Sequence, residues 1–364
     1  MSKTEMSCRR NRVGGEAVLE GVMMKAGEQC ATACRLESGD ITVTKQKFVS
    51  VRKKNKLLNL PIIRGVVNFV EMMKLSLASL NVSADAMGLN DEDEETKFEK
   101  WMKKHLGLRL TDALMVIAMV LGVGLALFLF MFLPSLAASG LQMLFGSAVT
   151  PFYSLIEGAV KILIFVSYIW LVALMPDIRR TFQYHGAEHK SIACFESGDA
   201  LTPENAKRHT RFHPRCGTSF MFVMILLGII IGFFVPASLP PILRAAVKIL
   251  LLPVVMGLGY EFIMFAGKHD SLFIRALSAP GLLMQRLTTR EPDEQQLEVA
   301  ITALKCAMIE EFPDFDTSHL TIKDLDTGDV TDPKKPENAT ETSEENAAVA
   351  PDEADESAPK NDEA

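Results

Sequence analysis

One apolar stretch without charge decides the fold class of this chain. Residues 113–133 read ALMVIAMVLGVGLALFLFMFL, which is 21 residues without an ionisable side chain. A helix of about 20 apolar residues matches the ~30 Å hydrocarbon core of a lipid bilayer. The sequence therefore predicts a membrane-spanning helix at this position.

Three later stretches have a similar character. Residues 158–175 contain one charged side chain, residues 219–235 contain none and residues 245–266 contain two. We therefore predict a mainly α integral membrane protein with about four transmembrane helices, in a membrane domain that covers residues 110–267.

Lys and Arg are distributed unevenly between the predicted spans. Residues 134–157 and 236–243 contain no Lys or Arg, whereas residues 176–217 contain seven. Because basic residues accumulate on the cytoplasmic side, the long central loop 176–217 and both termini are expected in the cytoplasm. The predicted location is the cell membrane, with several spans.

The flanking regions differ in composition from the spans. Residues 1–56 are punctuated by Gly and predict short strands and turns, so the N-terminal cytoplasmic portion is expected to be a small α+β unit. Residues 57–109 predict an amphipathic helix followed by an acidic linker. Residues 268–326 predict a helical cytoplasmic segment, with helical spacing of apolar residues over 294–311.

The last part of the chain, residues 327–364, is acidic. It holds 12 Asp/Glu and 3 Lys, a net charge of −9, so with −7 for the whole chain residues 1–326 carry about +2. With few apolar residues this tail is expected to be disordered. The near-neutral remainder gives no sign of a nucleic-acid partner, and the partner expected from composition is the lipid bilayer.

A motif in the central loop carries the candidate chemistry. His185, Glu188 and His189 belong to the run HGAEH, and on a helix all three share one face. Two imidazoles one turn apart can ligate a divalent metal, most plausibly Zn²⁺, and a neighbouring carboxylate can act as general base. The order H-x-x-E-H also occurs in inverzincin metallopeptidases.

A zinc site needs further ligands. Glu261 is an acidic residue inside a predicted span, where a charge needs a partner. His213 and Cys216 form another candidate pair just before the third span. The alternatives are that these histidines only hydrogen-bond to backbone or lipid phosphate, that Glu188 pairs with Lys190 or Arg211, and that Cys216 acts as a nucleophile.

The glycine-rich run 14–24, GGEAVLEGVMM, is not a phosphate-binding loop, because it lacks the GK[ST] ending. A tight, closely packed turn is the simpler interpretation. The alternative is that Glu20 approaches the metal site.

Six ordered blocks resemble the YqhQ-like family of bacterial membrane proteins, and the resemblance covers roughly residues 12–311. The blocks are GGEAVLEGVMM (14–24), RGV (64–66), YHGAEHK (184–190), HPRCGTSF (213–220), GYEF (259–262) and APGLLMQRLTTREPDEQQLEVAI (279–301). The resemblance implies a polytopic membrane protein from a family of unknown function, catalogued at most as predicted metal-dependent enzymes.

Two functions follow as hypotheses. The first is a membrane-embedded metal-dependent enzyme, specifically a hydrolase at the cytoplasmic membrane interface, with a lipid or peptide substrate. In it His185 and His189 bind the metal, Glu188 is the general base, and Glu261 or the pair His213 and Cys216 completes the ligands. The second is a non-enzymatic scaffold, assembly partner or small-solute carrier with a structural His/Glu cluster.

Overall fold

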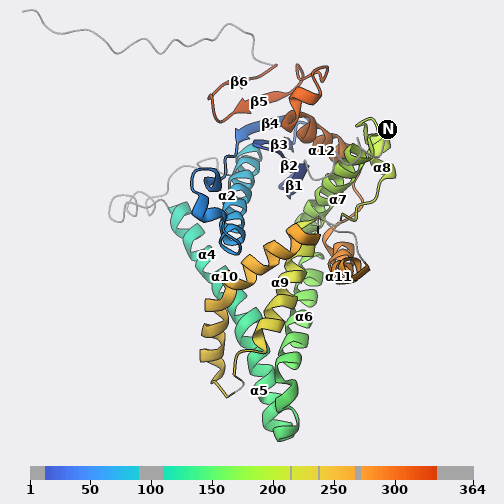
Figure 1. The fold of residues 1–364 in the computed structure, drawn as a ribbon. Helices are drawn as coiled ribbons and strands as arrows, with labels where there is room; N and C mark the ends of the chain where they lie inside the picture. The colour runs from blue at the N-terminus through green and yellow to red at the C-terminus, as the bar shows by residue number, and fades with distance from the viewer. Residues whose placement is uncertain (1–12, 90–109, 214, 237, 267–271, 334–364) are drawn as a thin grey trace, which may run out of the picture.

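The computed structural model describes residues 13–89, 110–213, 215–236, 238–266 and 272–333. Most of the predicted acidic linker and of the predicted disordered tail lies outside these residues. Figure 1 shows two regions: a small sheet with its covering helices at the top, and a bundle of apolar helices below it.

A six-stranded sheet forms the upper region, in the order β1-β2-β3-β4-β5-β6. The first four strands are consecutive antiparallel neighbours, as the glycine-punctuated sequence predicts. Their bounds are β1 Val13–Val18, β2 Gly21–Ala26, β3 Gln29–Arg35 and β4 Ile41–Lys47. The turn between β1 and β2 holds Glu20 at a φ of 48°, a backbone conformation that few non-glycine residues adopt.

Two strands from the C-terminal region complete the sheet. Strand β5, Thr321–Asp324, pairs with β4 in parallel, and β6, Val330–Thr331, pairs with β5. No local pattern in the sequence predicted either strand, and β6 lies inside the tail 327–364 that we expected to be disordered. Both are short, and their pairing depends on β4, a strand from the N-terminal region, as the pair Thr42 and Thr321 illustrates.

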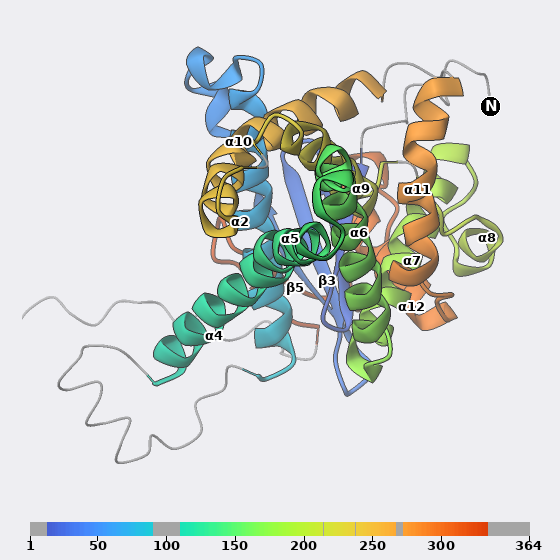
Figure 2. The same cartoon turned by 90° about the horizontal axis from the view of Figure 1, so that it is seen from below.

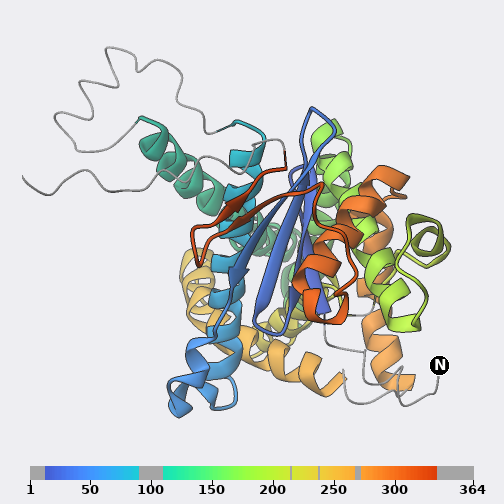
Figure 3. The ribbon, with the colours of Figure 1, turned by 90° about the horizontal axis from the view of Figure 1, so that it is seen from above.

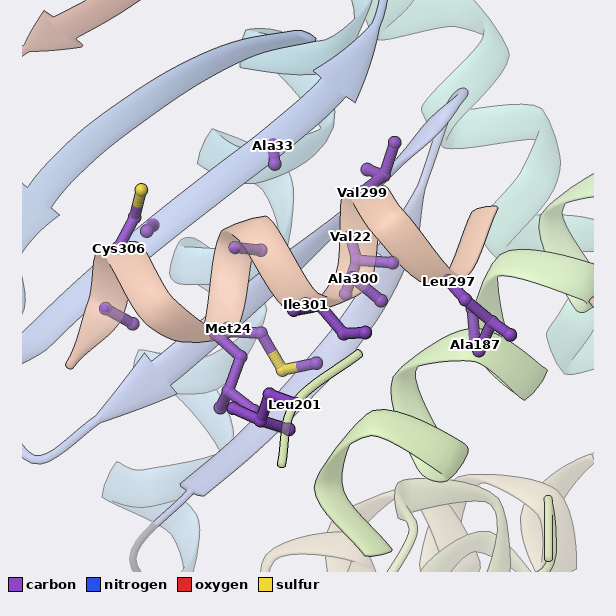
Figure 4. Close-up of a cluster of buried hydrophobic side chains, with 14 of the residues drawn as sticks. Val22, Met24, Ala33, Ala187, Leu201, Leu297, Val299, Ala300, Ile301 and Cys306 are labelled. Atoms are coloured by element: carbon purple, nitrogen blue, oxygen red, sulfur yellow. The ribbon is translucent and has the colours of Figure 1, made fainter. Parts of the chain in front are cut away.

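Side chains on β2 alternate between two hydrophobic clusters, as the period of a strand requires. Val22 and Met24 pack with helix α12, Glu294–Ala307, whereas Met23 packs with Leu75 of helix α2, Ile63–Ala86. Figure 3 shows the sheet between α2 and the pair α7 and α12, and Figure 4 shows the larger cluster. The sheet is therefore covered by helices on both faces.

Helix α12 confirms the predicted helical spacing. Leu297, Ile301, Leu304 and Met308 are all buried against the sheet. The helix begins with a capping box, in which the side chains of Asp293 and Gln296 each accept a hydrogen bond from the other residue's backbone N–H.

The lower region contains three helices that are long and apolar enough to cross a membrane: residues 117–145, 153–172 and 242–266. The first is a continuous helical rod, in which α4 (Leu110–Leu127), a π-helical turn (Phe128–Phe132) and α5 (Leu133–Phe145) follow one another. It continues past the predicted span 113–133 as far as Phe145, through a segment expected to be a loop. The other two are α6 (Tyr153–Val172) and α10 (Pro241–Ala266).

The remaining predicted span, residues 219–235, corresponds to a helix too short to cross the bilayer core. Helix α9 covers Gly217–Gly232, which is 16 residues or about 24 Å at 1.5 Å per residue, below the ~30 Å of the bilayer core. It packs against α10, α11 (Leu272–Thr288) and α6. Among the described residues three helices thus meet the length of a span, and the count of four stays a prediction.

The predicted central loop is largely helical. Helix α7, Pro176–Ser197, starts with Pro176 and ends at Gly198, whose φ of 83° suits a C-terminal cap. The short helix α8, Pro203–Arg208, follows. Helix α7, which carries the HGAEH motif, contacts β1 and α12, and in Figures 1 and 2 it continues from the end of α6 toward the sheet.

Candidate metal centre

Two histidines and one cysteine converge between the sheet and the bundle. His185 and His189 lie one turn apart on α7, and Cys216 immediately precedes α9. One potential ligand atom from each residue lies within 4.8 Å of the other two, and His185 Nε2 is 3.2 Å from Cys216 Sγ. These separations are close to the ~3–4 Å that separate the ligands of one zinc ion.

Backbone carbonyls orient both imidazoles. The Nδ1 of His185 lies 2.8 Å from the Thr288 carbonyl oxygen, and the Nδ1 of His189 lies 2.5 Å from that of Arg211. A carbonyl only accepts, so in both rings Nδ1 carries the proton and Nε2 is the acceptor, which in His185 lies 3.2 Å from Cys216 Sγ. This is the arrangement found in most metal-binding histidines.

The atoms directed at the cluster are buried and lack ordinary partners. His189 is 1% exposed, and within the described residues its Nε2 has no hydrogen-bond partner. Glu188 Oε2 is also buried and also has no hydrogen-bond partner within the described residues, and it lies 4.0 Å from His185 Nε2. Burial lowers the pKa of His189, which favours the neutral ring that can bind a metal.

Glu188 is held against the sheet. The backbone N–H of Gly15 donates to its carboxylate, and burial raises its pKa to about 7, with the nearby Glu16 adding to this effect. His185 acts in the opposite direction. A carboxylate with a pKa near neutrality and an oxygen next to a ligand atom is suited to general acid–base work.

Glycine makes two close approaches possible here. A Cβ on Gly15 would lie 2.6 Å from the Met23 carbonyl oxygen and 3.1 Å from Glu188 Cγ. A Cβ on Gly186 would lie 2.0 Å from the Arg290 carbonyl oxygen, in the segment that follows α11. Gly186 thus lets α7 approach the segment after α11 closely, and the Thr288 carbonyl at the end of α11 lies next to His185.

Glu261 has a different neighbour from the one predicted. Both oxygens of its carboxylate are bound by the Arg64 guanidinium, with 2.6 Å between Arg64 Nε and Glu261 Oε1. It is not one of the three residues whose ligand atoms converge. The charge of Glu261 inside α10 therefore has a partner on α2. That partner is a basic side chain, whereas we expected a metal ion.

His213 lies beside the cluster. Its ring centroid is 5.5 Å from that of His189, and its Nε2 lies 3.3 Å from Arg215 Nη2 and 3.7 Å from Glu196 Oε2. Gln285 fixes the backbone of His213 through two hydrogen bonds, one to its N–H and one to its carbonyl. Of the predicted pair, Cys216 reaches the two histidines with a ligand atom, while His213 contacts Arg215 and Glu196.

A cavity of about 420 Å³ adjoins the cluster and is lined by His185, Glu188, His189, Cys216 and Glu16. Glu16 was not among the residues predicted for the site. Glu20, the acidic residue that the sequence suggested instead, pairs with Arg180 and accepts a hydrogen bond from Tyr184, just before the motif. The sequence feature that could have indicated Glu16 is its position next to Gly15, the glycine at which β1 approaches Glu188 of α7 closely.

The fold and the site together define a mainly helical protein, whose described residues include three apolar helices long enough for a membrane and a partly buried His–His–Cys group beside a small sheet. The chain belongs to the family described as "Protein of unknown function (DUF1385)", whose match covers residues 60–310. It is also 35% identical over 289 residues to the "Uncharacterized protein YqhQ" of Bacillus subtilis (strain 168), which covers 79% of this chain and 89% of that protein.

These two matches confirm the family resemblance deduced from the six sequence blocks. No solved structure matches the chain.

Proposed function

We propose that this protein is a membrane-embedded, metal-dependent enzyme, and specifically a hydrolase that works at the cytoplasmic membrane interface. The observation that carries the proposal is the convergence of His185, His189 and Cys216, with both Nδ1 atoms held by carbonyls. Two imidazoles and one thiolate are a donor set suited to Zn²⁺.

The donor set fits a catalytic metal. Catalytic zinc sites use three protein ligands and keep one position open, whereas structural sites use four. The buried Nε2 of His189 also fits, because among the described residues it has no hydrogen-bond partner within ordinary distance, and such an atom is costly to bury unless something binds it. A divalent ion bound here supplies Lewis-acid chemistry.

The roles of the protein side chains follow from their positions. His185, His189 and Cys216 would hold the ion. Glu188 receives a proton from the attacking water at Oε2 and passes it to the leaving group, while the Gly15 N–H keeps the carboxylate in place. The adjoining cavity admits the scissile group of the substrate.

Four variants test this assignment. His185→Ala, His189→Ala and Cys216→Ala should each lose most of the zinc bound by the purified protein, together with some thermal stability, because ligation is coupled to folding. Glu188→Gln should keep both, because an amide preserves shape but is no base at neutral pH. Only complementation of a deletion strain should then fail.

The measurements are metal content by mass spectrometry, melting temperature in detergent, and complementation. His213→Gln serves as the matched control, since His213 Nε2 contacts Arg215 and Glu196. If Glu188→Gln complements fully, and the wild-type protein binds no metal, the cluster is structural. The non-enzymatic scaffold would then be the better hypothesis.

A further inference from the structure

A second and much larger cleft adjoins the candidate metal centre. Its volume is about 1560 Å³, beyond the roughly 300–1,000 Å³ of most small-molecule pockets. It shares part of its wall with the smaller cavity at the histidines, including Gly15, Glu16, Cys216 and Met221. The two spaces are therefore adjacent along strand β1 and the start of α9.

The walls of this cleft differ in character along its length. Apart from the sheet, apolar side chains from four helices line the cleft: Phe69 and Met72 of α2, Met119 and Val123 of α4, Met221 of α9 and Ile263 of α10. On the sheet side it is charged, with Lys25, Lys45, Lys47 and Asp326. Such a cleft suits a molecule with one apolar and one polar part.

The apolar wall lies on helices suited to a bilayer. Helices α4 and α10 belong to the stretches long and apolar enough to span one. Met119 is 60% exposed and Val123 is 55% exposed, although both line the cleft. The part of the cleft that α4 lines therefore adjoins a surface expected to contact the hydrocarbon chains of a bilayer.

We propose that the substrate is a membrane lipid whose hydrocarbon chain lies in this cleft against α2 and α4, with its polar end at His185, His189 and Cys216. The inference rests on the proposed function, because it names the substrate class of that site. It selects a lipid over a peptide, since a peptide backbone would leave polar groups unpaired along the apolar wall.

Photolabelling tests the proposal in full-length protein. The protein is placed in nanodiscs of phosphatidylethanolamine and phosphatidylglycerol that contain a phospholipid with a diazirine in its acyl chain. Adducts are expected on Phe69 and Met72, which are partly buried and face the cleft. Leu163 of α6, 66% exposed and absent from the cleft lining, should be labelled as a general lipid contact.

Two tryptophan variants of α4 distinguish the cleft from the outer surface. Val123→Trp fills the cleft and should lower the adducts on α2 about tenfold, the effect of displacing roughly two buried CH₂ groups. Val120→Trp makes the same change on the same helix, but Val120 does not line the cleft, so the adducts should not change. Leu163 labelling should be constant in both.

The outcomes separate this inference from the proposed function. Adducts on Leu163 without adducts on α2, or equal losses in the two tryptophan variants, would overturn the lipid proposal. Labelling of α2 by an apolar photoreactive peptide, but not by the lipid, would identify a peptide substrate instead. Failure of the proposed function is a different result, namely wild-type protein that binds no zinc.

Discussion

Single residues at the contact between β1 and α7 determine how closely the sheet approaches the candidate metal ligands. Gly15 donates its N–H to Glu188, and the space for a side chain there is taken by the Met23 carbonyl and by Glu188 itself. Gly14, one residue earlier, has no atom within 4 Å of the position of a Cβ. The two neighbouring glycines thus have different structural requirements.

The first prediction uses this difference. Gly15→Ala should destabilise the fold by about 1–3 kcal/mol, because an added methyl in a packed contact forces the strand or Glu188 to move. Complementation should fall with it. Gly14→Ala is the control and should change neither property. Thermal unfolding of the two variants is the measurement, and equal melting temperatures would contradict the proposed contact.

At the scale of elements, the pairing of α2 with α10 organises the large cleft. Arg64 of α2 binds Glu261 of α10, and the helices approach closely where Gly65 faces Gly257 and Tyr260. Ile62, just before α2, has a φ of 69°, which is uncommon for a branched residue and shows how tightly this corner is fixed. The ion pair with Arg64 thus accounts for the charge of Glu261 inside α10, which the sequence had suggested as a metal ligand.

A double-mutant cycle measures this pairing. Arg64→Gln and Glu261→Gln should each lower stability, and the double variant should lose less than the sum. The expected coupling is about 1–3 kcal/mol for hydrogen bonds between charged groups. Zinc content should remain that of the wild type in all three variants, because Glu261 lies outside the converging ligand atoms. Strict additivity, or zinc loss in Glu261→Gln, would contradict this account.

For the whole molecule, the question is on which side of the membrane the sheet lies. The segment 146–152 between α5 and α6 lies at the end of the bundle opposite the sheet, and residues 134–157 contain no Lys or Arg (Figure 1). The segment 176–217 carries seven basic residues and adjoins the sheet. By the positive-inside rule, we expect the sheet and the histidines in the cytoplasm.

Reporter fusions test this orientation. A fusion after Ala148 should report an external location, and fusions after Gly198 and after Asp332 should report the cytoplasm. Fusions at the same positions carrying the complementary reporter, active only on the other side, provide the control. A cytoplasmic signal after Ala148 would invert the topology and place the candidate metal centre outside the cell.

The sequence by itself determined the features that depend on local periodicity. Runs of apolar residues indicated α4, α6 and α10, alternation and glycines indicated β1 to β4, and the i, i+4 spacing placed His185 and His189 on one face of a helix. These features follow from the geometry of a single element. The helical period of about 3.6 residues and the strand period of about two residues do not depend on the rest of the chain.

Only the tertiary structure decided which distant residues meet. Cys216 and Glu261 both follow His189 well beyond the end of its helix, and nothing in their spacing says which one reaches the histidines. Arg64, from helix α2 in the N-terminal part of the chain, binds Glu261, whereas the start of α9 brings Cys216 to the site. The same long-range packing places Gly15 against Glu188 and pairs β5 with β4. Such contacts depend on how whole elements pack, a property that no local pattern contains.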